Sequence, residues 1–296
     1  MLISKKNKLS ITFKDDKYTY EQLLRYSQLY ADKFSLESRP EKVMICAQNS
    51  PEWCFAFYGA MRCEAIVIPL DAQSTKKEIE YVINDCRPDI VFVSDDKKEM
   101  FSDLELQGAR LMTKDDVLLS DDDNIPATDI PLRGKDDVML INYTSGTTGN
   151  PKGVMLTFNN VMFNVDSVSK QVPIFQPDSN VMVLLPLHHI LPLLGSLVAP
   201  LYMGGTLHIA EAMNAESIIK TLNAGKVSII IGVPRLYDML VKGIMNKINA
   251  SFVTRLLYKI TKLIGSDKVS RIVFSSVHKK FGGHLKYLVS GGAALS

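Results

Sequence analysis

The chain carries the stretch Tyr143-Thr-Ser-Gly-Thr-Thr-Gly-Asn-Pro-Lys-Gly-Val154 between two apolar segments. Leu140 and Ile141 precede this stretch, and Met155 and Leu156 follow it. Both flanks are typical of short buried strands, so the sequence predicts a strand, a tight loop and a second strand. The loop combines three glycines, several hydroxyl groups and one lysine. This composition indicates a backbone that approaches an anion closely.

Glycine and hydroxyl side chains serve an anion site in different ways. Glycine accepts a positive φ and has no side chain, so the amide groups of the loop can point at phosphate oxygens. The hydroxyl groups add donors, and Lys152 adds a positive charge beside Pro151. The predicted hydroxyl and glycine positions are Thr144, Ser145, Gly146, Thr147, Thr148, Gly149 and Gly153.

Two familiar phosphate loops do not match this stretch. The pattern G-x-x-x-x-G-K-S/T fails because Pro151 replaces its second glycine and Gly153 replaces its Ser/Thr. The pattern G-x-G-x-x-G fails because the stretch contains no G-x-G. The remaining alternative is a plain polar hairpin loop. Ordinary loops do not usually combine five hydroxyl or lysine donors with three glycines in ten residues.

The stretch resembles the signature of the adenylate-forming superfamily, which includes acyl-CoA synthetases, peptide-synthetase adenylation domains and luciferases. Every defined position of the family signature is met, and other family motifs are matched in family order along the whole chain. These further matches are Thr19–Leu23, Asn49–Trp53, Ile68–Asp71, Leu185–His189, Gly232–Arg235 and Ser290–Leu295. Within the superfamily, the segment Phe281–Ser290 is similar to long-chain fatty acyl-CoA synthetases.

The resemblance implies a reaction and its reactants. ATP activates a long-chain fatty acid to an acyl-adenylate, with Mg²⁺ as cofactor, and CoA then accepts the acyl group while AMP leaves. Alternatives are another adenylate-forming ligase, such as an acyl-ACP synthetase, an aryl-CoA ligase or an adenylation domain, and a non-catalytic nucleotide- or lipid-binding module. The segment after Ser296 and a substrate screen would separate the ligases.

The resemblance also implies roles for individual residues. Thr144 and Lys152 are the expected catalytic residues for the phosphates, and Thr144 is also expected near the magnesium ion. His189 corresponds to the family's histidine near the acyl carboxylate, but a core histidine bonded to backbone is an equal alternative. We expect His188 to have a supporting role, and an ion pair is as plausible for Arg235 as a family role. The small residues expected against adenine and the acyl group are Gly291, Gly292 and Ala293, with a simple turn as the alternative.

Strands alternate with helices along the first hundred residues, which argues for an α/β fold with a parallel sheet. Strands are expected at 43–47, 65–69 and 90–93, with helices beginning after Thr19, at Pro51 and after Thr75. The resemblance implies the large N-terminal domain of the acyl-CoA synthetase/luciferase-like fold, with parallel-rich sheets and packed helices. Family members run to about twice this length, so we expect 1–296 to be one truncated AMP-binding domain that lacks the C-terminal lid and has little or no activity.

Later segments are also assigned from the sequence. The stretch 181–207 is interrupted by prolines, histidines and glycines, so it predicts a strand, a buried helix and a strand rather than a membrane span. Helices are expected at 158–170, 215–224, 234–248, 252–264 and 269–281. The apolar residues of 236–248 either line a fatty-acid tunnel or belong to the core, and their helical spacing favours the core.

Composition sets limits on the protein's class. A hydrophobic content of 46% with 22% charged residues in 296 residues is typical of a soluble globular protein. The net charge is +2, but residues 95–137 carry a net −7 and residues 242–286 a net +9. The basic stretch suits an anionic membrane, the phosphates of CoA or, more simply, a solvated helix face. It lacks a recognisable nucleic-acid motif, so we expect no nucleic-acid partner.

Cysteine usage favours a cytoplasmic protein. The four cysteines form no C-x-x-C pair and lie in apolar segments, as buried reduced thiols do. The first residues contain no apolar core that could serve as a signal peptide. We expect a cytoplasmic location, with peripheral contact to the inner face of a membrane left open by the basic stretch. Self-association is a further expectation if missing sheet partners leave apolar surface exposed.

Overall fold

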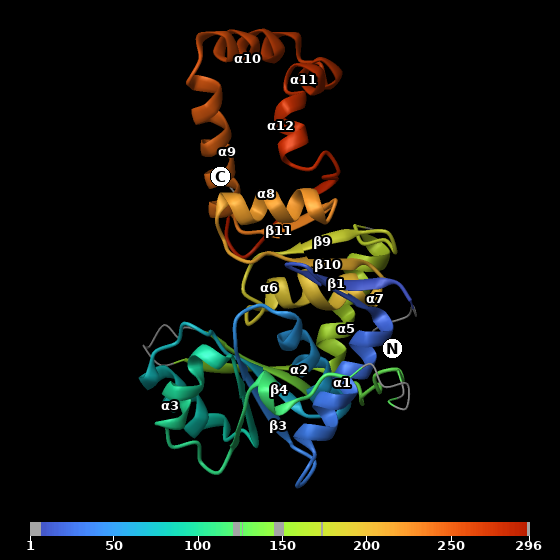
Figure 1. Ribbon diagram of the computed structural model, residues 1–296, viewed down its shortest axis with the longest axis vertical. Coiled ribbons are helices and arrows are strands. Elements are labelled where there is room, and N and C mark those ends of the chain that lie inside the picture. Colours follow the sequence, from blue (N-terminus) through green and yellow to red (C-terminus); the bar gives the residue numbers. More distant parts are fainter. Residues whose placement is uncertain (1–6, 121–124, 126, 145–150, 173, 295–296) are drawn as a thin grey trace.

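Two six-stranded sheets form the body of the molecule in the computed structural model, which describes residues 7–120, 125, 127–144, 151–172 and 174–294 (Figure 1). The first sheet has the order β6-β5-β3-β4-β7-β8, and the second has the order β12-β11-β9-β10-β1-β2. The first sheet consists of β6 (Arg110–Met112), β5 (Ile90–Val93), β3 (Lys42–Cys46), β4 (Ile66–Pro69), β7 (Val138–Thr144) and β8 (Lys152–Thr157). The second consists of β12 (Tyr287–Ser290), β11 (Ile229–Gly232), β9 (Asn180–Val183), β10 (Thr206–Ile209), β1 (Leu9–Phe13) and β2 (Asp16–Thr19).

Neighbouring strands are parallel in both sheets, except that β7–β8 and β1–β2 are antiparallel. The predicted α/β class with parallel-rich sheets is therefore confirmed. The carboxyl ends of parallel strands lie at one edge of each sheet, which is where ligand sites of α/β folds form. The antiparallel pair β1–β2 was not predicted. β1 also pairs with β10, nearly two hundred residues away, and no local sequence pattern predicts a pairing over that distance.

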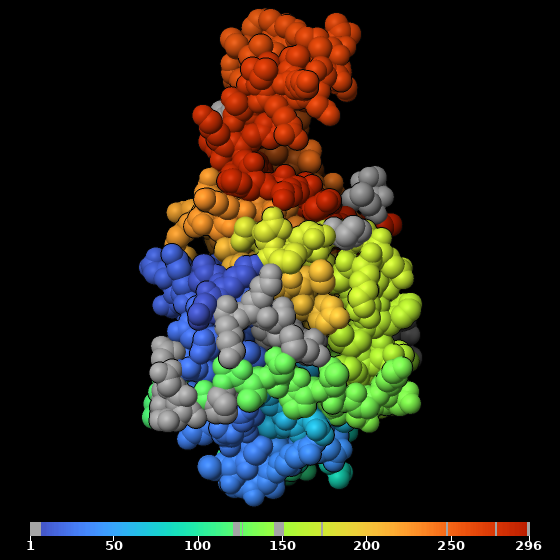
Figure 2. Space-filling model, turned by 90° about the vertical axis from the view of Figure 1, so that its right-hand side faces the viewer, coloured from blue at the N-terminus to red at the C-terminus, as the bar shows by residue number. Residues whose placement is uncertain are grey.

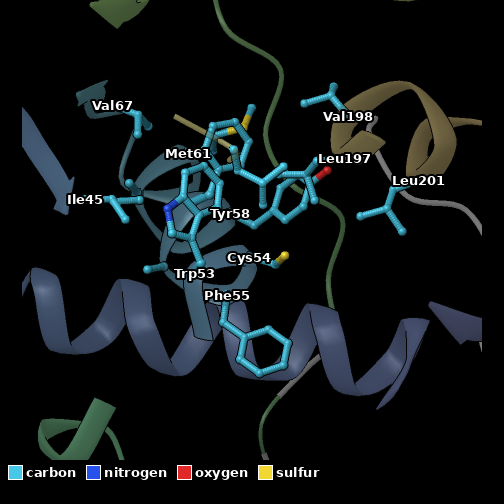
Figure 3. Packing of buried hydrophobic residues seen from close by; sticks show 14 of the residues in the cluster. Ile45, Trp53, Cys54, Phe55, Tyr58, Met61, Val67, Leu197, Val198 and Leu201 are labelled. Carbon is cyan, nitrogen blue, oxygen red and sulfur yellow. The ribbon is translucent and has the colours of Figure 1, made fainter. Parts of the chain in front are cut away.

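The main core lies between the two sheets, around helices α1 (Tyr20–Phe34) and α2 (Pro51–Arg62). Figure 3 shows Trp53 and Tyr58 of α2 between Ile45 and Val67 on one side and the segment of Leu197–Leu201 on the other, whereas Phe55 points toward α1. Trp53 stacks on Phe57 at a centroid distance of 5.6 Å. A single aromatic cluster thus joins the two sheets.

Local hydrogen bonds fix where these helices begin. Thr19 forms a capping box with Gln22, and Thr75 forms one with Glu78 at the start of α3 (Lys76–Cys86). Pro51 occupies the first turn of α2, where its missing N–H costs nothing. These predicted helix starts are confirmed. α1 and α2 approach closely at Gly59, where an added Cβ would lie 2.6 Å from Cβ of Tyr30.

Residues 181–207 form β9, a buried helical segment and β10, as predicted. The helical segment comprises α6 (Ile190–Pro192), the π-helical η4 (Leu193–Val198) and α7 (Ala199–Tyr202). Within the described residues, no helix has the length and apolar character to cross a bilayer. Two further short helices, α4 (Lys98–Ser102) and α5 (Phe158–Asp166), flank the first sheet, and α8 (Ala215–Ala224) precedes β11.

Four helices form an arm that projects from the second sheet (Figures 1 and 2). They are α9 (Pro234–Asn249), α10 (Phe252–Ile264), α11 (Asp267–Val273) and α12 (Ser275–Lys280). The predictions for α8, α9 and α10 are confirmed. The single helix predicted at 269–281 is wrong, because the chain turns at Phe274 and divides it into α11 and α12.

All four cysteines are free and buried, as the sequence indicates. Burial raises the pKa of the Cys46 thiol to about 12 and that of Cys86 to about 11. Because the thiolate is the reactive form, these side chains act as small core residues rather than as nucleophiles.

Candidate functional site

The signature stretch begins in one strand and ends in another, as predicted. β7 is largely buried, but β8 is exposed at Val154 and Met155, so the prediction of a buried second strand is wrong. β7 and β8 pair in an antiparallel ladder whose last register pair is Thr144 with Lys152. Both residues are exposed at the mouth of the loop. The glycine and hydroxyl positions predicted within the loop, Ser145, Gly146, Thr147, Thr148 and Gly149, lie outside the described residues.

The base of this loop is held by close packing. Gly153 lies against Ile141 and Tyr143, and an added Cβ would lie 2.8 Å from Cγ2 of Ile141. The Tyr143 hydroxyl donates a hydrogen bond of 2.6 Å to Oδ2 of Asp85 on α3. Burial and this hydrogen bond raise the pKa of Tyr143. Tyr143 and Gly153 thus hold the ends of β7 and β8 against the body, a role that the sequence pattern did not reveal.

The histidine segment is held by residues of the first sheet, although it follows a strand of the second. Asn49, just after β3, accepts a bond from the Leu187 amide and donates one to the Leu185 carbonyl, both at 2.9 Å. Asn142 on β7 donates to the His188 carbonyl at 2.7 Å. These two asparagines bring the carboxyl ends of both sheets to one place, and sequence reasoning assigned neither of them this role.

His188 and His189 form a hydrogen-bonded pair at this junction. Their Nε2 atoms are 3.1 Å apart and their ring centroids 4.0 Å apart. Asp71, just after β4, places Oδ2 at 3.7 Å from Nε2 of His188. Burial, and then the neighbouring His189, lower the pKa of His188 to about 4, while Asp71 acts in the opposite direction. His188 is therefore neutral at pH 7.

A bond between two Nε2 atoms requires that only one of them carries the proton. The two Nε2 atoms therefore share one proton. His189 is exposed, so it is not the core histidine that was the alternative to a site role. His188 is partly buried beneath it, in line with the supporting role predicted for that residue.

The glycines after β12 lie next to the segment that follows the histidines. The Gly291 amide donates to the Gly232 carbonyl at 3.1 Å, and an added Cβ would lie 3.1 Å from Cδ2 of Leu191. Gly292 has φ +76°, which disfavours a side chain. Glycine is therefore favoured at 292 by its backbone conformation, and a side chain at 291 would have to displace the end of Leu191 slightly. Ala293 is exposed and lies just beyond this approach.

An apolar cavity of about 340 Å³ adjoins the segment that follows His189 and the strand that precedes Gly291. It lies between α5, the segment after His189 and strands β11 and β12. Its lining includes Leu156, Ile190, Leu191, Leu194, Ile231 and Val289. Ile190 directly follows His189, and Val289 lies two residues before Gly291. The volume is within the range of small-molecule sites, and the lining suits an aliphatic chain.

The apolar residues of 236–248 border a different cavity. Met239, Leu240, Ile244 and Ile248 contribute to an apolar space of about 440 Å³ between α8 and the helices of the arm. Leu236 instead belongs to a buried cluster beneath β11. The stretch is therefore partly core and partly cavity wall, and neither sequence alternative describes it fully.

Thr144, His189 and Gly291–Gly292 lie at the carboxyl ends of strands β7, β9 and β12. Asn142 and Leu191 link these ends by direct contact. Among the described residues, no cluster of three or more His, Cys, Asp or Glu side chains is placed to hold a metal. The Thr144 hydroxyl is a hard oxygen donor of the kind that Mg²⁺ accepts together with phosphate oxygens.

The profile of the AMP-binding enzyme family matches residues 4–296. The chain belongs to this family. Members of this adenylate-forming family use ATP, a carboxylate substrate and CoA.

Relatives of this AMP-binding chain include several CoA ligases. Long-chain-fatty-acid–CoA ligase 1 of Saccharomyces cerevisiae is 33% identical over 199 residues, which cover 62% of this chain and 28% of the yeast protein. Human long-chain-fatty-acid–CoA ligase ACSBG2 is 26% identical over 308 residues, which cover 89% of this chain and 46% of that protein. Feruloyl-CoA synthase of an Amycolatopsis species is 27% identical over 198 residues, which cover 67% of this chain and 39% of that protein. The chain thus spans less than half the length of these relatives.

Solved structures agree on the fold. ATP-bound MatB from Rhodopseudomonas palustris matches with a TM-score of 0.71 and 25% identity, covering 97% of this chain and 52% of that one. The inhibitor-bound N-terminal domain of FACL13 from Mycobacterium tuberculosis matches with a TM-score of 0.73 and 20% identity, covering 97% of this chain and 67% of that one. The fold is that of the N-terminal domains of adenylate-forming enzymes, as the sequence predicted.

Proposed function

We propose that this chain is part of an AMP-forming ligase that converts a long-chain fatty acid to its acyl-adenylate and then to acyl-CoA. The observation that carries the proposal is the apolar cavity beside His189 and Gly291, at the junction of the two sheets. It would receive the aliphatic chain while the carboxylate faces the signature loop. The names of the yeast and human relatives support the same substrate class.

In the first half-reaction the carboxylate oxygen attacks the α-phosphorus of ATP and pyrophosphate leaves. Both reactants are anions, so charge neutralisation and positioning dominate catalysis. Lys152 and the loop amides would bind the β- and γ-phosphates, which depart together. Thr144 would hold magnesium, which supplies further positive charge to the triphosphate when bound.

The histidine pair is suited to orient the carboxylate. His188 is neutral at pH 7 and hydrogen-bonded to His189, so it fixes the ring of its neighbour. His189 is exposed and can donate or accept a hydrogen bond toward a ligand. Gly291, Gly292 and Ala293 would leave room for a flat adenine ring against the strand end. In the second half-reaction the CoA thiolate attacks the acyl carbonyl and AMP leaves.

We further propose that residues 1–296 belong to the large AMP-binding domain and that the rest of the activity, including a C-terminal lid, comes from chain beyond these residues. The share of each relative that is covered supports this division. A cytoplasmic location is part of the proposal, and the four buried free thiols support it.

Fatty-acid-dependent exchange between ATP and labelled pyrophosphate tests the adenylation step. In a protein extended to the length of the relatives, we expect Lys152→Ala to reduce exchange by about 10²-fold, because one charge-stabilising donor is lost. Lys33→Ala, an exposed lysine of α1, is the matched control and should leave exchange unchanged. Normal ATP kinetics in Lys152→Ala would show that this lysine does not take part in ATP binding.

The same assay separates the competing substrates. Feruloyl-CoA synthase and a malonate–CoA ligase are also relatives, so aromatic and short acids belong in the screen. Exchange with one of these acids and none with fatty acids would contradict the proposed fatty-acid substrate but would still support ligase activity. Exchange with no acid at all would leave a nucleotide- or lipid-binding module without catalysis.

A further inference from the structure

Helix α10 turns its polar side inward and its apolar side outward. Thr254, Tyr258 and Thr261 are spaced by four and three residues, so they share one side of the helix. Thr261 is only 4% exposed, whereas Phe252 is 72% and Leu263 90% exposed. A helix that packs on a water-soluble body shows the opposite arrangement. The outward apolar residues are Phe252, Val253, Leu256, Ile260, Leu263 and Ile264.

The two threonines of the inward side have their hydroxyl groups satisfied by the chain itself. The Thr261 hydroxyl donates to the carbonyls of Leu257 and Tyr258 at 3.0 Å. The Thr254 hydroxyl donates to the carbonyls of Ile248 and Ser251 at 2.5 and 3.0 Å. Because both threonine hydroxyls are bonded within the chain, these two residues can face the rest of the arm at little cost. The inverted orientation is therefore stable within the arm and leaves the apolar face uncovered.

Positive charge borders the exposed apolar face. Arg255, Lys259 and Lys262 are exposed and follow one another along the neighbouring strip of the helix. The surrounding stretch 242–286 contains ten Lys or Arg residues and a single acidic residue, Asp267. An apolar strip beside a basic strip is the pattern of helices that lie in the interface of a membrane.

The position of α10 allows a flat surface to reach it. The helix lies across the far end of the arm, away from both sheets (Figure 1), and the arm is narrower than the body (Figure 2). A second copy of this chain is a poor occupant, because two arms whose 242–286 stretches each carry a net charge of +9 would repel. An anionic lipid surface matches the apolar strip and the sign of the charge together.

We propose that α10 is an interfacial helix that docks the arm on an anionic phospholipid membrane. Its apolar strip enters the boundary between headgroups and acyl chains, and its basic strip contacts lipid phosphates. Nothing in this docking requires the adenylation reaction, so it stands or fails separately from the proposed ligase activity.

Co-sedimentation with vesicles tests the docking. The chain should bind vesicles of 30 mol% phosphatidylserine in phosphatidylcholine, and bind vesicles of phosphatidylcholine alone far more weakly. Each basic residue near an anionic surface contributes about a fivefold gain in affinity, so the triple variant Arg255→Glu, Lys259→Glu, Lys262→Glu should bind at least about 100-fold more weakly. Its matched control, Lys17→Glu, Lys33→Glu, Lys77→Glu, changes the same charge on the body and should retain most binding.

The apolar strip needs its own variants. Phe252→Ser with Leu263→Ser should reduce vesicle binding at least tenfold, since both side chains would leave the lipid. Leu36→Ser with Leu132→Ser, which removes exposed leucines of the body, should not. All four side chains are exposed, so circular dichroism should show the same fold in every variant.

Insertion can be read directly from fluorescence. The native Trp53 is fully buried in the body, so it reports little on the arm. A tryptophan introduced by Leu263→Trp should shift its emission to the blue on anionic vesicles and be quenched by brominated acyl chains. Absence of binding to anionic vesicles, or binding that the α10 variants leave unchanged, would overturn the proposal. If the chain instead forms concentration-dependent dimers that the same variants abolish, the apolar strip of α10 binds a second copy of the chain, and the membrane proposal is wrong.

Discussion

Helix α2 of the body and helix α10 of the arm both carry apolar residues at helical spacing, yet they use them in opposite ways. In α2, Trp53 and Phe55 are fully buried between the two sheets. In α10, Phe252 and Leu263 are almost fully exposed. The comparison teaches that periodicity reveals an apolar face but does not say what covers it. In the body the cover is another part of the chain, and in the arm we infer that it is lipid.

The largest difference is expected from removing one aromatic side chain in each region. Trp53→Ala should lower the free energy of unfolding by about 3–5 kcal/mol, because it opens a cavity in the core that joins the sheets. Phe252→Ala should change it by no more than about 0.5 kcal/mol, because its side chain is already in water. Urea unfolding followed by far-UV circular dichroism measures both. An equal loss in the two variants would mean that the arm buries its apolar face.

Acid should destabilise the body through a buried histidine. His208 on β10 is 6% exposed, with Nδ1 at 2.7 Å from the Thr12 hydroxyl and Nε2 at 3.0 Å from Oδ1 of Asn180. Burial lowers its pKa to about 4 from the ordinary value of 6.5. The folded state therefore resists a proton that the unfolded state accepts. The contribution of neutral His208 is complete above pH 6.5 and is lost as the pH falls toward 4.

The loss at pH 4 is expected to reach about 3 kcal/mol for His208, and His188 adds to it because its pKa is also lowered to about 4. Urea unfolding at several pH values between 7 and 4 measures the slope of the free energy of unfolding against pH. In His208→Gln the slope should be shallower, since one of the two titrating groups is gone. The same slope in the variant and the parent would show that His208 does not govern the acid sensitivity.

Two glycines distinguish the tight body from the open arm. Gly59→Ala should destabilise by about 1–3 kcal/mol, because the new Cβ would meet Tyr30 at 2.6 Å where α1 and α2 cross. Gly243→Ala in α9 should stabilise by about 1 kcal/mol, because alanine favours the helix and no other atom lies within 4 Å of its Cβ. Thermal unfolding of both variants tests the signs. A destabilised Gly243→Ala would indicate that α9 packs more tightly than its surroundings suggest.

Features held by neighbours in sequence were predictable. The capping boxes at Thr19 and Thr75 join residues three positions apart, so the order of side chains is enough to identify them. The two strands that end at Thr144 and begin at Lys152 are readable for the same reason, since they are two apolar runs separated by glycines and hydroxyl groups. The roles of all the predicted site residues, including Thr144, Lys152 and His189, stay predictions.

Features held by distant residues were not predictable. Asn49 secures the histidine segment across more than 130 positions of sequence, and β1 finds β10 across nearly two hundred. The histidine at 208 shows no pattern that distinguishes a buried structural residue from a ligand. Each of these depends on which segments become neighbours in space.

The sequence by itself determined the family, the α/β class, most helix starts and the two strands that flank the glycine-rich stretch. These are local matters of hydrogen bonding, side-chain volume and apolar spacing. Only the tertiary structure decided that His188 is neutral, that Gly291 lies close to Leu191, and that the apolar side of α10 faces outward. Burial, close approach and exposure are properties of pairs of segments, and a single segment does not contain them.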